Sequence, residues 1–156
     1  WPRTYQSPAY PNLFAVGIAF APPHPISRPR TSVRGTPIAP APPRTGMPSG
    51  VMGRTVAQNL AGMIQRGEAG PRRHASMAEM GAACIASAGA GMRSGTAAAM
   101  TMFPVVPDYQ RYPRFGRDVG DTYGEIGLAA HWLKHILHHV FIYKAKARLG
   151  WALLPE

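Results

Sequence analysis

The chain has 156 residues, the size of one modest domain, and its 17 lysines and arginines outnumber 7 acidic residues to give a formal charge of +10. Gly and Pro number 17 each and only 15% of residues are charged, so we expect a small hydrophobic core. The single cysteine, Cys84, excludes an internal disulfide and a cysteine-cluster zinc site. No apolar run reaches the roughly 18 to 20 residues that span a bilayer. The chain opens on Trp1 without a signal-like segment, and we expect it to be the C-terminal piece of a longer protein.

The basic charge does not favour nucleic-acid binding. Residues 1–67 contain seven arginines and no acidic residue, but the arginines are spread singly among prolines and glycines. Nucleic-acid binders usually cluster such charges on one helix face or interleave them with aromatic rings. We therefore expect no nucleic-acid partner. Positive charge near a flavin or near anionic lipid headgroups explains the composition as well.

The first expected element is a buried strand. The apolar run from Tyr10 to Phe20 is bracketed by prolines, which is typical of a short strand inside a domain. Residues 22–44 follow with eight prolines and almost no hydrophobic periodicity, and they predict an extended Pro-rich loop.

Residues 45–67 predict the most regular helix of the first half of the chain. Apolar side chains recur at three- and four-residue spacing, and Gly67 suits the end of a helix. The N-terminus at Thr45 and Gly46 would present partial positive charge to an electron-rich group of a ligand. The recurring residues are Met52, Val56, Leu60, Met63 and Ile64.

Small apolar residues between Ala82 and Val106, with turn signals near Gly91 and Gly95, predict two strands in a β-hairpin. A helix is the alternative, because Ala-rich segments favour helices. An aromatic-rich loop follows, and a long helix is expected from Gly124 to Leu149.

This last helix carries a broad apolar stripe, with its charged residues largely off it. A helix at a membrane interface and a helix packed on a domain core share this pattern, so both interpretations stay open from the pattern alone. Histidines at positions 131, 135 and 139 could chelate a metal, but no carboxylate or cysteine accompanies them, and we expect no metal site. Protonatable histidines near headgroups or a quinone are the favoured use. The stripe consists of Ala129, Trp132, Leu133, Ile136, Leu137, Val140 and Phe141.

Three segments together resemble one family. Residues 10–19 read Tyr-Pro-Asn-Leu-Phe-Ala-Val-Gly-Ile-Ala, residues 42–47 read Pro-Pro-Arg-Thr-Gly-Met, and residues 81–91 read Gly-Ala-Ala-Cys-Ile-Ala-Ser-Ala-Gly-Ala-Gly. In this order they resemble the YPNIFAxGIAVA strand, the Pro-Lys-Thr-Gly-aromatic segment and the NAVCLADFGDxG strand of the sulfide:quinone oxidoreductases. Residues 102–108 and, after an insertion, residues 131–146 are similar to the tail of that family. Met47 is a departure, since the family has an aromatic residue there.

The resemblance implies an α+β fold that is the C-terminal portion of a flavoprotein with two dinucleotide-binding domains. Residues 1–21 would be the last strand of the FAD-binding domain and residues 22–44 its Pro-rich loop. Residues 45–67 would form a flavin-facing helix, and residues 68–123 a β-hairpin and an aromatic loop. Residues 124–156 would hold a C-terminal amphipathic helix at the membrane interface.

The resemblance also implies roles for individual residues. Cys84 would be a catalytic cysteine that handles sulfur beside the flavin; taken alone, it would read as a buried structural thiol. The quinone and the membrane would be contacted by Lys134, Leu137 and Phe141, although Leu137 stands where the family usually has an aromatic residue. The FAD ring would be contacted by Gly17, Ile18, Arg44, Thr45 and Gly46.

The activity implied is electron transfer from sulfide, through a redox cysteine and FAD, to a membrane quinone. The FAD site is incomplete in this chain, because it has no phosphate-cradling Gly-x-Gly-x-x-Gly. Expected partners are the N-terminal dinucleotide-binding part of the same protein, sulfide, quinone and a membrane surface that holds the protein peripherally; a homo-oligomer stays open. The alternatives are an NADH:quinone oxidoreductase, a flavocytochrome c sulfide dehydrogenase-like protein, and a non-enzymatic membrane-surface module. Cys84 argues against the NADH:quinone oxidoreductase, and the final helix argues against the flavocytochrome c sulfide dehydrogenase-like protein.

Overall fold

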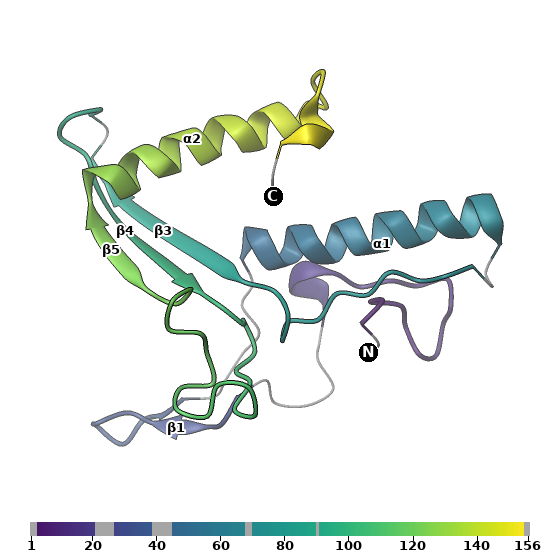
Figure 1. The fold of residues 1–156 in the computed structure, drawn as a ribbon, viewed down its shortest axis with the longest axis horizontal. Helices are drawn as coiled ribbons and strands as arrows, with labels where there is room; N and C mark the ends of the chain where they lie inside the picture. Colours follow the sequence, from purple (N-terminus) through teal and green to yellow (C-terminus); the bar gives the residue numbers. More distant parts are fainter. Residues whose placement is uncertain (1–2, 21–26, 39–44, 68–69, 90, 155–156) are drawn as a thin grey trace. The chain divides into compact units, whose positions relative to one another are not determined.

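The computed structural model describes residues 3–20, 27–38, 45–67, 70–89 and 91–154. Within these residues the chain is an α+β protein with two α-helices and two antiparallel sheets (Figure 1). The α+β class expected from the sequence is therefore confirmed. The chain divides into two compact units: the first is Trp1–Ala82 with Phe103–Asp118, and the second is Ala83–Met102 with Val119–Glu156.

The first unit is built around the helix α1, which spans Gly46–Arg66. The predicted helix over 45–67 is thus confirmed. Gly67, at φ +77°, closes it by donating its N–H to the carbonyl of Met63 at 2.9 Å. This conformation is one that glycine adopts without steric cost.

The buried face of α1 differs from the predicted stripe. Met52 and Val56 are buried, but Leu60 and Ile64 are exposed. The reason is the segment 70–75, which covers the neighbouring face. There the carboxamide of Asn59 donates to the carbonyl of Arg73 at 2.9 Å and accepts from its N–H at 2.7 Å. A polar side chain therefore occupies a core position that periodicity assigns to apolar residues.

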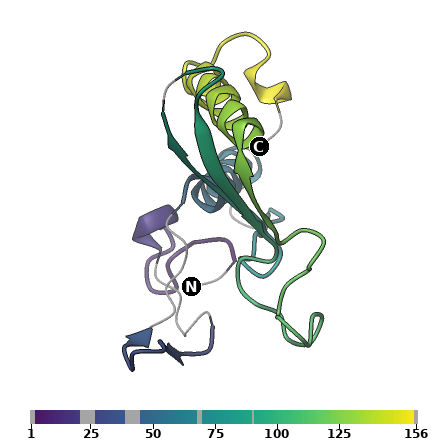
Figure 2. The same cartoon turned by 90° about the vertical axis from the view of Figure 1, so that its left-hand side faces the viewer.

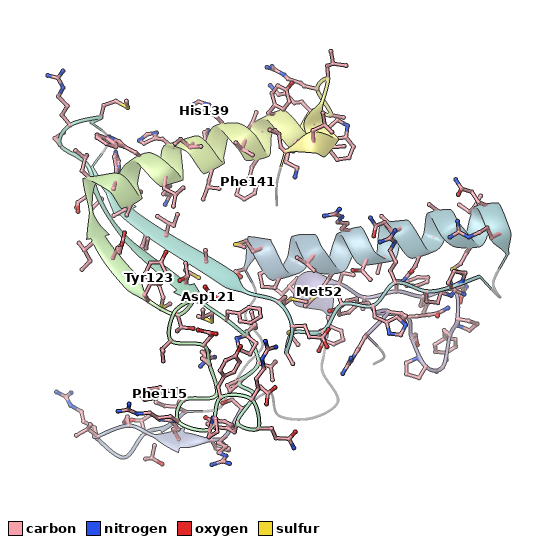
Figure 3. All side chains as sticks on the ribbon, viewed as in Figure 1. Met52, Phe115, Asp121, Tyr123, His139 and Phe141 are labelled. Carbon is pink, nitrogen blue, oxygen red and sulfur yellow. The ribbon has the colours of Figure 1, made fainter. Side chains whose placement is uncertain are left out.

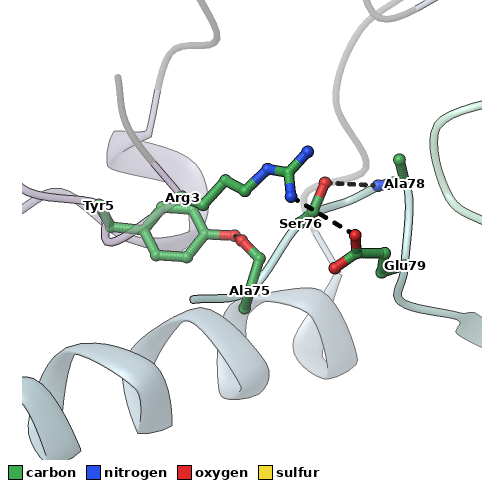
Figure 4. Close-up of polar contacts among 6 residues, drawn as sticks. All are labelled: Arg3, Tyr5, Ala75, Ser76, Ala78 and Glu79. Carbon is green, nitrogen blue, oxygen red and sulfur yellow. Dashed lines mark hydrogen bonds and ion pairs between the residues drawn. The ribbon is translucent and has the colours of Figure 1, made fainter. Parts of the chain in front are cut away.

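The core of the first unit also contains Tyr5, which is 2% exposed. Its hydroxyl donates to the carbonyl of Ala75 at 2.9 Å (Figure 4). Phe20 packs against the Tyr5 ring edge to face, with centroids 5.0 Å apart. Burial raises the pKa of Tyr5 to about 12. Beside this contact Arg3 and Glu79 form an exposed ion pair, in which a guanidinium nitrogen lies 3.5 Å from a carboxylate oxygen.

The predicted strand over residues 10–20 is wrong. The segment forms one isolated antiparallel bridge, between Gln6 and Phe14, and then the 3-10 turn η1 at Gly17–Ala19. A tight turn returns the chain at Leu13, whose N–H bonds to the carbonyl of Tyr10, so no extended run develops. Apolar composition alone did not distinguish a strand from a folded turn.

Only part of the predicted Pro-rich loop, residues 27–38, lies in the described chain. It contains a small hairpin of β1 (Arg30–Thr31) and β2 (Pro37–Ile38), both exposed. The cation of Arg28 lies over the ring of Tyr109, 4.6 Å from its centroid. This contact joins the loop to the aromatic segment of the same unit.

The second unit is a three-stranded sheet with a helix on it. Strands β3 (Ala82–Ala88), β4 (Thr96–Met102) and β5 (Gly124–Gly127) lie in the order β3-β4-β5, which confirms the predicted hairpin. The helix α2 (Leu128–Ala145) follows β5 directly and packs on β4 (Figures 1 and 2).

The final helix is shorter than predicted at both ends. Residues 124–127 pair with β4 instead, with Ile126 opposite Ala98, so the helix begins only at Leu128. After Ala145 the chain turns, and a second 3-10 turn, η2, spans Trp151–Leu153. In the part of the chain that the structure describes, no helix is long and apolar enough to cross a membrane.

Candidate functional site

The first candidate region is formed by η1 against the first turns of α1. The N–H of Gly17 donates to the sulfur of Met52 at 3.3 Å. Gly17 has φ +59°, and a Cβ there would lie 2.9 Å from the hydroxyl of Ser49. A Cβ at this position would force the Ser49 side chain to move, and the positive φ itself favours glycine. Ile18, the next residue, is 72% exposed.

The N-terminus of α1 has no side-chain cap. Thr45 is the N-cap residue and has an extended backbone, but its side chain makes no capping hydrogen bond. Its hydroxyl oxygen is buried and has no partner among the described residues. Ser49 instead donates its hydroxyl to the carbonyl of Thr45 at 2.8 Å. The N–H groups of the first turn, next to the exposed Gly46, are therefore not capped by a side chain.

Four of the five residues predicted to contact a cofactor thus belong to one region. Gly17 and Ile18 lie on the turn that packs on α1, and Thr45 and Gly46 begin that helix. Arg44, the fifth, lies outside the described residues. Chemically, an uncapped helix N-terminus beside an exposed apolar side chain can receive an electron-rich, planar group.

Cys84 lies in the second unit, in the middle of β3. Cys84 is a free cysteine, and the residue is half-buried. β3 is an edge strand of the sheet in the described chain. The ammonium of Lys134, from α2, donates to the carbonyl of Ile85 at 3.3 Å. Lys134 thus reaches from the helix to the edge strand and satisfies a backbone acceptor that would otherwise be open to pairing with another strand.

The three residues predicted to contact a quinone share one side of α2. Lys134, Leu137 and Phe141 have the spacing i, i+3, i+7, which places them on one helix face. Leu137 is half-buried and Phe141 is 54% exposed. His139 leaves the helix on the opposite side from Phe141 (Figure 3).

A shallow groove of about 440 Å³ runs along β4 and β5 of the second unit. None of the predicted site residues lines it. Its walls are mainly apolar, and Glu125 supplies the one ionisable carboxylate. The lining residues are Ala98, Ala99, Met100, Thr101, Thr122, Tyr123, Gly124, Glu125 and Ile126.

Two of the three histidines considered above as metal ligands are in contact. The imidazoles of His131 and His135 meet with their Nε2 atoms 3.1 Å apart. The four-residue spacing indicated that the two histidines share a helix face. The burial of His131 depends on its packing against Gly95, which lies 36 positions earlier in the sequence. His139 makes its ring contact with His138 instead. Within the described ranges no three His, Cys, Asp or Glu side chains gather in a way that could hold a metal.

No protein-family model, curated protein or solved structure matches the chain.

Proposed function

We propose that the chain is the flavin-facing and quinone-facing part of an FAD-dependent oxidoreductase of the sulfide:quinone type. In this proposal electrons pass from sulfide, by way of Cys84 and FAD, to a quinone in the membrane. One observation carries it. The turn at Gly17, in one segment that resembles the family, packs on the helix α1, which begins in a second such segment at Thr45 and Gly46.

That packing suits a flavin ring. Gly17 brings the backbone of η1 close to α1, and the uncapped N-terminus at Gly46 directs N–H groups toward an electron-rich group. Ile18 would offer an apolar surface to a ring face. When bound, FAD supplies an acceptor of two electrons that can pass them on to a quinone. The pyrophosphate and adenosine would be held by a dinucleotide-binding part of the same protein, because this sequence has no phosphate-binding glycine motif.

Cys84 would receive the sulfur. A hydrosulfide ion attacks a disulfide formed by Cys84 and a cysteine elsewhere in the protein. One S–S bond forms, the original S–S bond breaks, and a thiolate leaves. The half-buried position of Cys84 gives a small anion access, and the Lys134 ammonium, bonded at the next residue of β3, would favour an anion approaching this strand.

The exposed apolar side chains of α2 and η2 would serve the membrane. Ala130 and His131 are buried in the first turn of α2, but large apolar side chains are exposed from the second turn onward. An amphipathic helix with exposed apolar residues and nearby lysines suits a membrane interface, which would hold the protein peripherally and bring the quinone to it. The exposed residues are Leu133, Ile136, Phe141, Ile142 and Trp151.

A non-enzymatic membrane-surface module is the second candidate, and the same exposed apolar residues favour it. Flavin content separates the two. The enzyme proposal expects the intact protein to carry FAD and this chain alone to bind it weakly, because the chain supplies ring contacts without a pyrophosphate site. An intact protein that purifies without flavin and binds none would support the module.

The decisive experiment is an anaerobic sulfide titration of the intact flavoprotein that contains this chain. The variant Cys84→Ser should keep its flavin but lose flavin reduction by sulfide, while dithionite still reduces it. Ser87→Ala is the matched control, because Ser87 is an exposed residue on the same strand. If the serine variant is reduced by sulfide at the wild-type rate, Cys84 is structural and the sulfide proposal fails.

A further inference from the structure

His131 and His135 form a contact at the start of α2 that the proposed function does not use. Their rings meet edge to face, with centroids 4.6 Å apart, and the two Nε2 atoms are 3.1 Å apart. His131 is 2% exposed, whereas His135 is exposed. The Nε2 atom of a buried ring and the Nε2 atom of an exposed residue therefore lie within hydrogen-bond distance of each other.

The fold holds the His131 ring in this position. The ring lies directly over Gly95 of the β3–β4 turn, where any Cβ would overlap it. The neighbouring Trp132 fastens the helix to the same turn, because its indole N–H donates to the carbonyl of Met92 at 2.7 Å. Ala97, on β4 next to this turn, is 1% exposed. The imidazole of His131 is thus preorganised, and that lowers the entropy lost when it binds a ligand.

Only one nitrogen of His131 is available for binding. Its Nδ1 is buried and has no hydrogen-bond partner among the described residues, whereas its Nε2 meets the Nε2 of His135. A hydrogen bond between two such nitrogens requires one proton, shared between two converging lone pairs. For a metal ion to bind both Nε2 atoms, the ring that carries the Nε2 proton changes to its Nδ1–H tautomer by proton exchange with water, and both Nε2 lone pairs are then free for the ion.

The distance between the two Nε2 atoms suits a chelated metal. Imidazole binds Zn²⁺ at about 2.0–2.1 Å, so two ligands lie about 2.9 Å apart at 90° and about 3.4 Å apart at a tetrahedral angle. The observed 3.1 Å falls between these values.

We infer that His131 and His135 form a two-histidine chelate for a borderline divalent metal ion, Zn²⁺, Ni²⁺ or Cu²⁺. Neutral imidazole nitrogens prefer these ions to Mg²⁺ or Ca²⁺, which take oxygen ligands. The exposed side of His135 leaves the remaining coordination positions to water. Two ligands from successive turns of one helix bind as a unit, so loss of either one abolishes the chelate.

The test is titration of the untagged, metal-free chain with Ni²⁺ and Zn²⁺, followed by calorimetry. One tight site per chain is expected, and His135→Ala should weaken binding by about tenfold or more. His135 is the residue to change, because it is exposed and its loss leaves the packing of His131 on Gly95 intact. His139→Ala is the matched control on the same helix and should bind as the wild type does.

Electron paramagnetic resonance of the Cu²⁺ form gives a second readout that a merely structural role would not change. The wild type and His139→Ala should show two coordinated imidazole nitrogens, and His135→Ala one. Circular dichroism confirms that each variant is folded. The proposal is overturned if the wild type shows no saturable binding, or if His135→Ala binds with unchanged affinity and an unchanged spectrum.

Discussion

At the scale of single residues, Tyr5 couples the stability of the first unit to pH. Its hydroxyl is buried and bonded to the carbonyl of Ala75, and burial raises its pKa from 10 to about 12. The neutral phenol is the form that the fold favours. Its contribution to stability is therefore fully present below pH 10 and is lost as the pH rises toward 12.

Comparing Tyr5→Phe with the wild type isolates this effect. Near neutral pH the variant should be less stable by about 1 kcal/mol, because the Ala75 carbonyl loses its donor. This difference should shrink and then reverse between pH 10 and 12, because only the wild type must bury an ionising phenol. Denaturant unfolding at several pH values measures it. A difference that stays constant up to pH 12 would mean that the Tyr5 hydroxyl is hydrated.

Gly17 is the residue on which the candidate flavin region depends most. Gly17→Ala should destabilise the protein by about 2–4 kcal/mol, because it combines a positive φ with an overlap on Ser49. Gly35→Ala is a matched control: Gly35 also has a positive φ, +80°, but nothing lies within 4 Å of its Cβ position. It should cost only about 1–2 kcal/mol. Equal losses in thermal unfolding would show that η1 does not pack on α1.

At the scale of elements, α1 is held to the segment 70–75 by one side chain. Asn59 is 3% exposed and makes two hydrogen bonds to the backbone of Arg73. Asn59→Ala should lower the free energy of unfolding by about 1–3 kcal/mol, since it removes both hydrogen bonds to the Arg73 backbone. Gln65→Ala, on the exposed end of the same helix, should change it by less than about 0.5 kcal/mol. Faster hydrogen exchange at Arg73 in the Asn59 variant alone would locate the effect.

The sequence predicted elements whose signals are local. Apolar periodicity and Gly67 predicted α1, and turn residues predicted the β3–β4 hairpin. The sequence did not predict the structure of segments whose conformation depends on pairing with another segment. Residues 124–127 extend a helical pattern, yet they pair with β4 because an open edge is available there. The segment at residues 10–20 pairs only through one bridge, between Phe14 and Gln6, and then folds into a turn.

At the candidate sites, too, the sequence predicted local features but not the contacts between segments that lie far apart in the chain. The resemblance selected Gly17 and Thr45 separately, and no property of either residue predicted that their segments pack together. The His131–His135 contact needed two pieces of information: the helical spacing, which the sequence contains, and the closeness of Gly95, which only the folded chain provides.

At the scale of the whole molecule, the charge and the exposed apolar surface favour the same kind of partner. The formal charge is +10, and each basic residue near an anionic lipid surface contributes about 1 kcal/mol of attraction. Charge alone gives binding that salt abolishes. Exposed apolar residues of the second unit, such as Phe141 and Trp151, would add a contribution that salt does not screen.

We therefore expect a larger fraction of the chain to sediment with phosphatidylglycerol vesicles than with phosphatidylcholine vesicles at low salt. At high salt the remaining binding should depend on insertion of apolar side chains. The double variant Phe141→Ser and Trp151→Ser should lose this salt-resistant fraction, because it removes two exposed rings from α2 and η2. Tyr10→Ser is the matched control, since Tyr10 is an exposed ring in the first unit. Equal salt-resistant binding by the double variant and the control would mean that α2 does not enter the interface, and that its exposed apolar residues serve contact with protein instead.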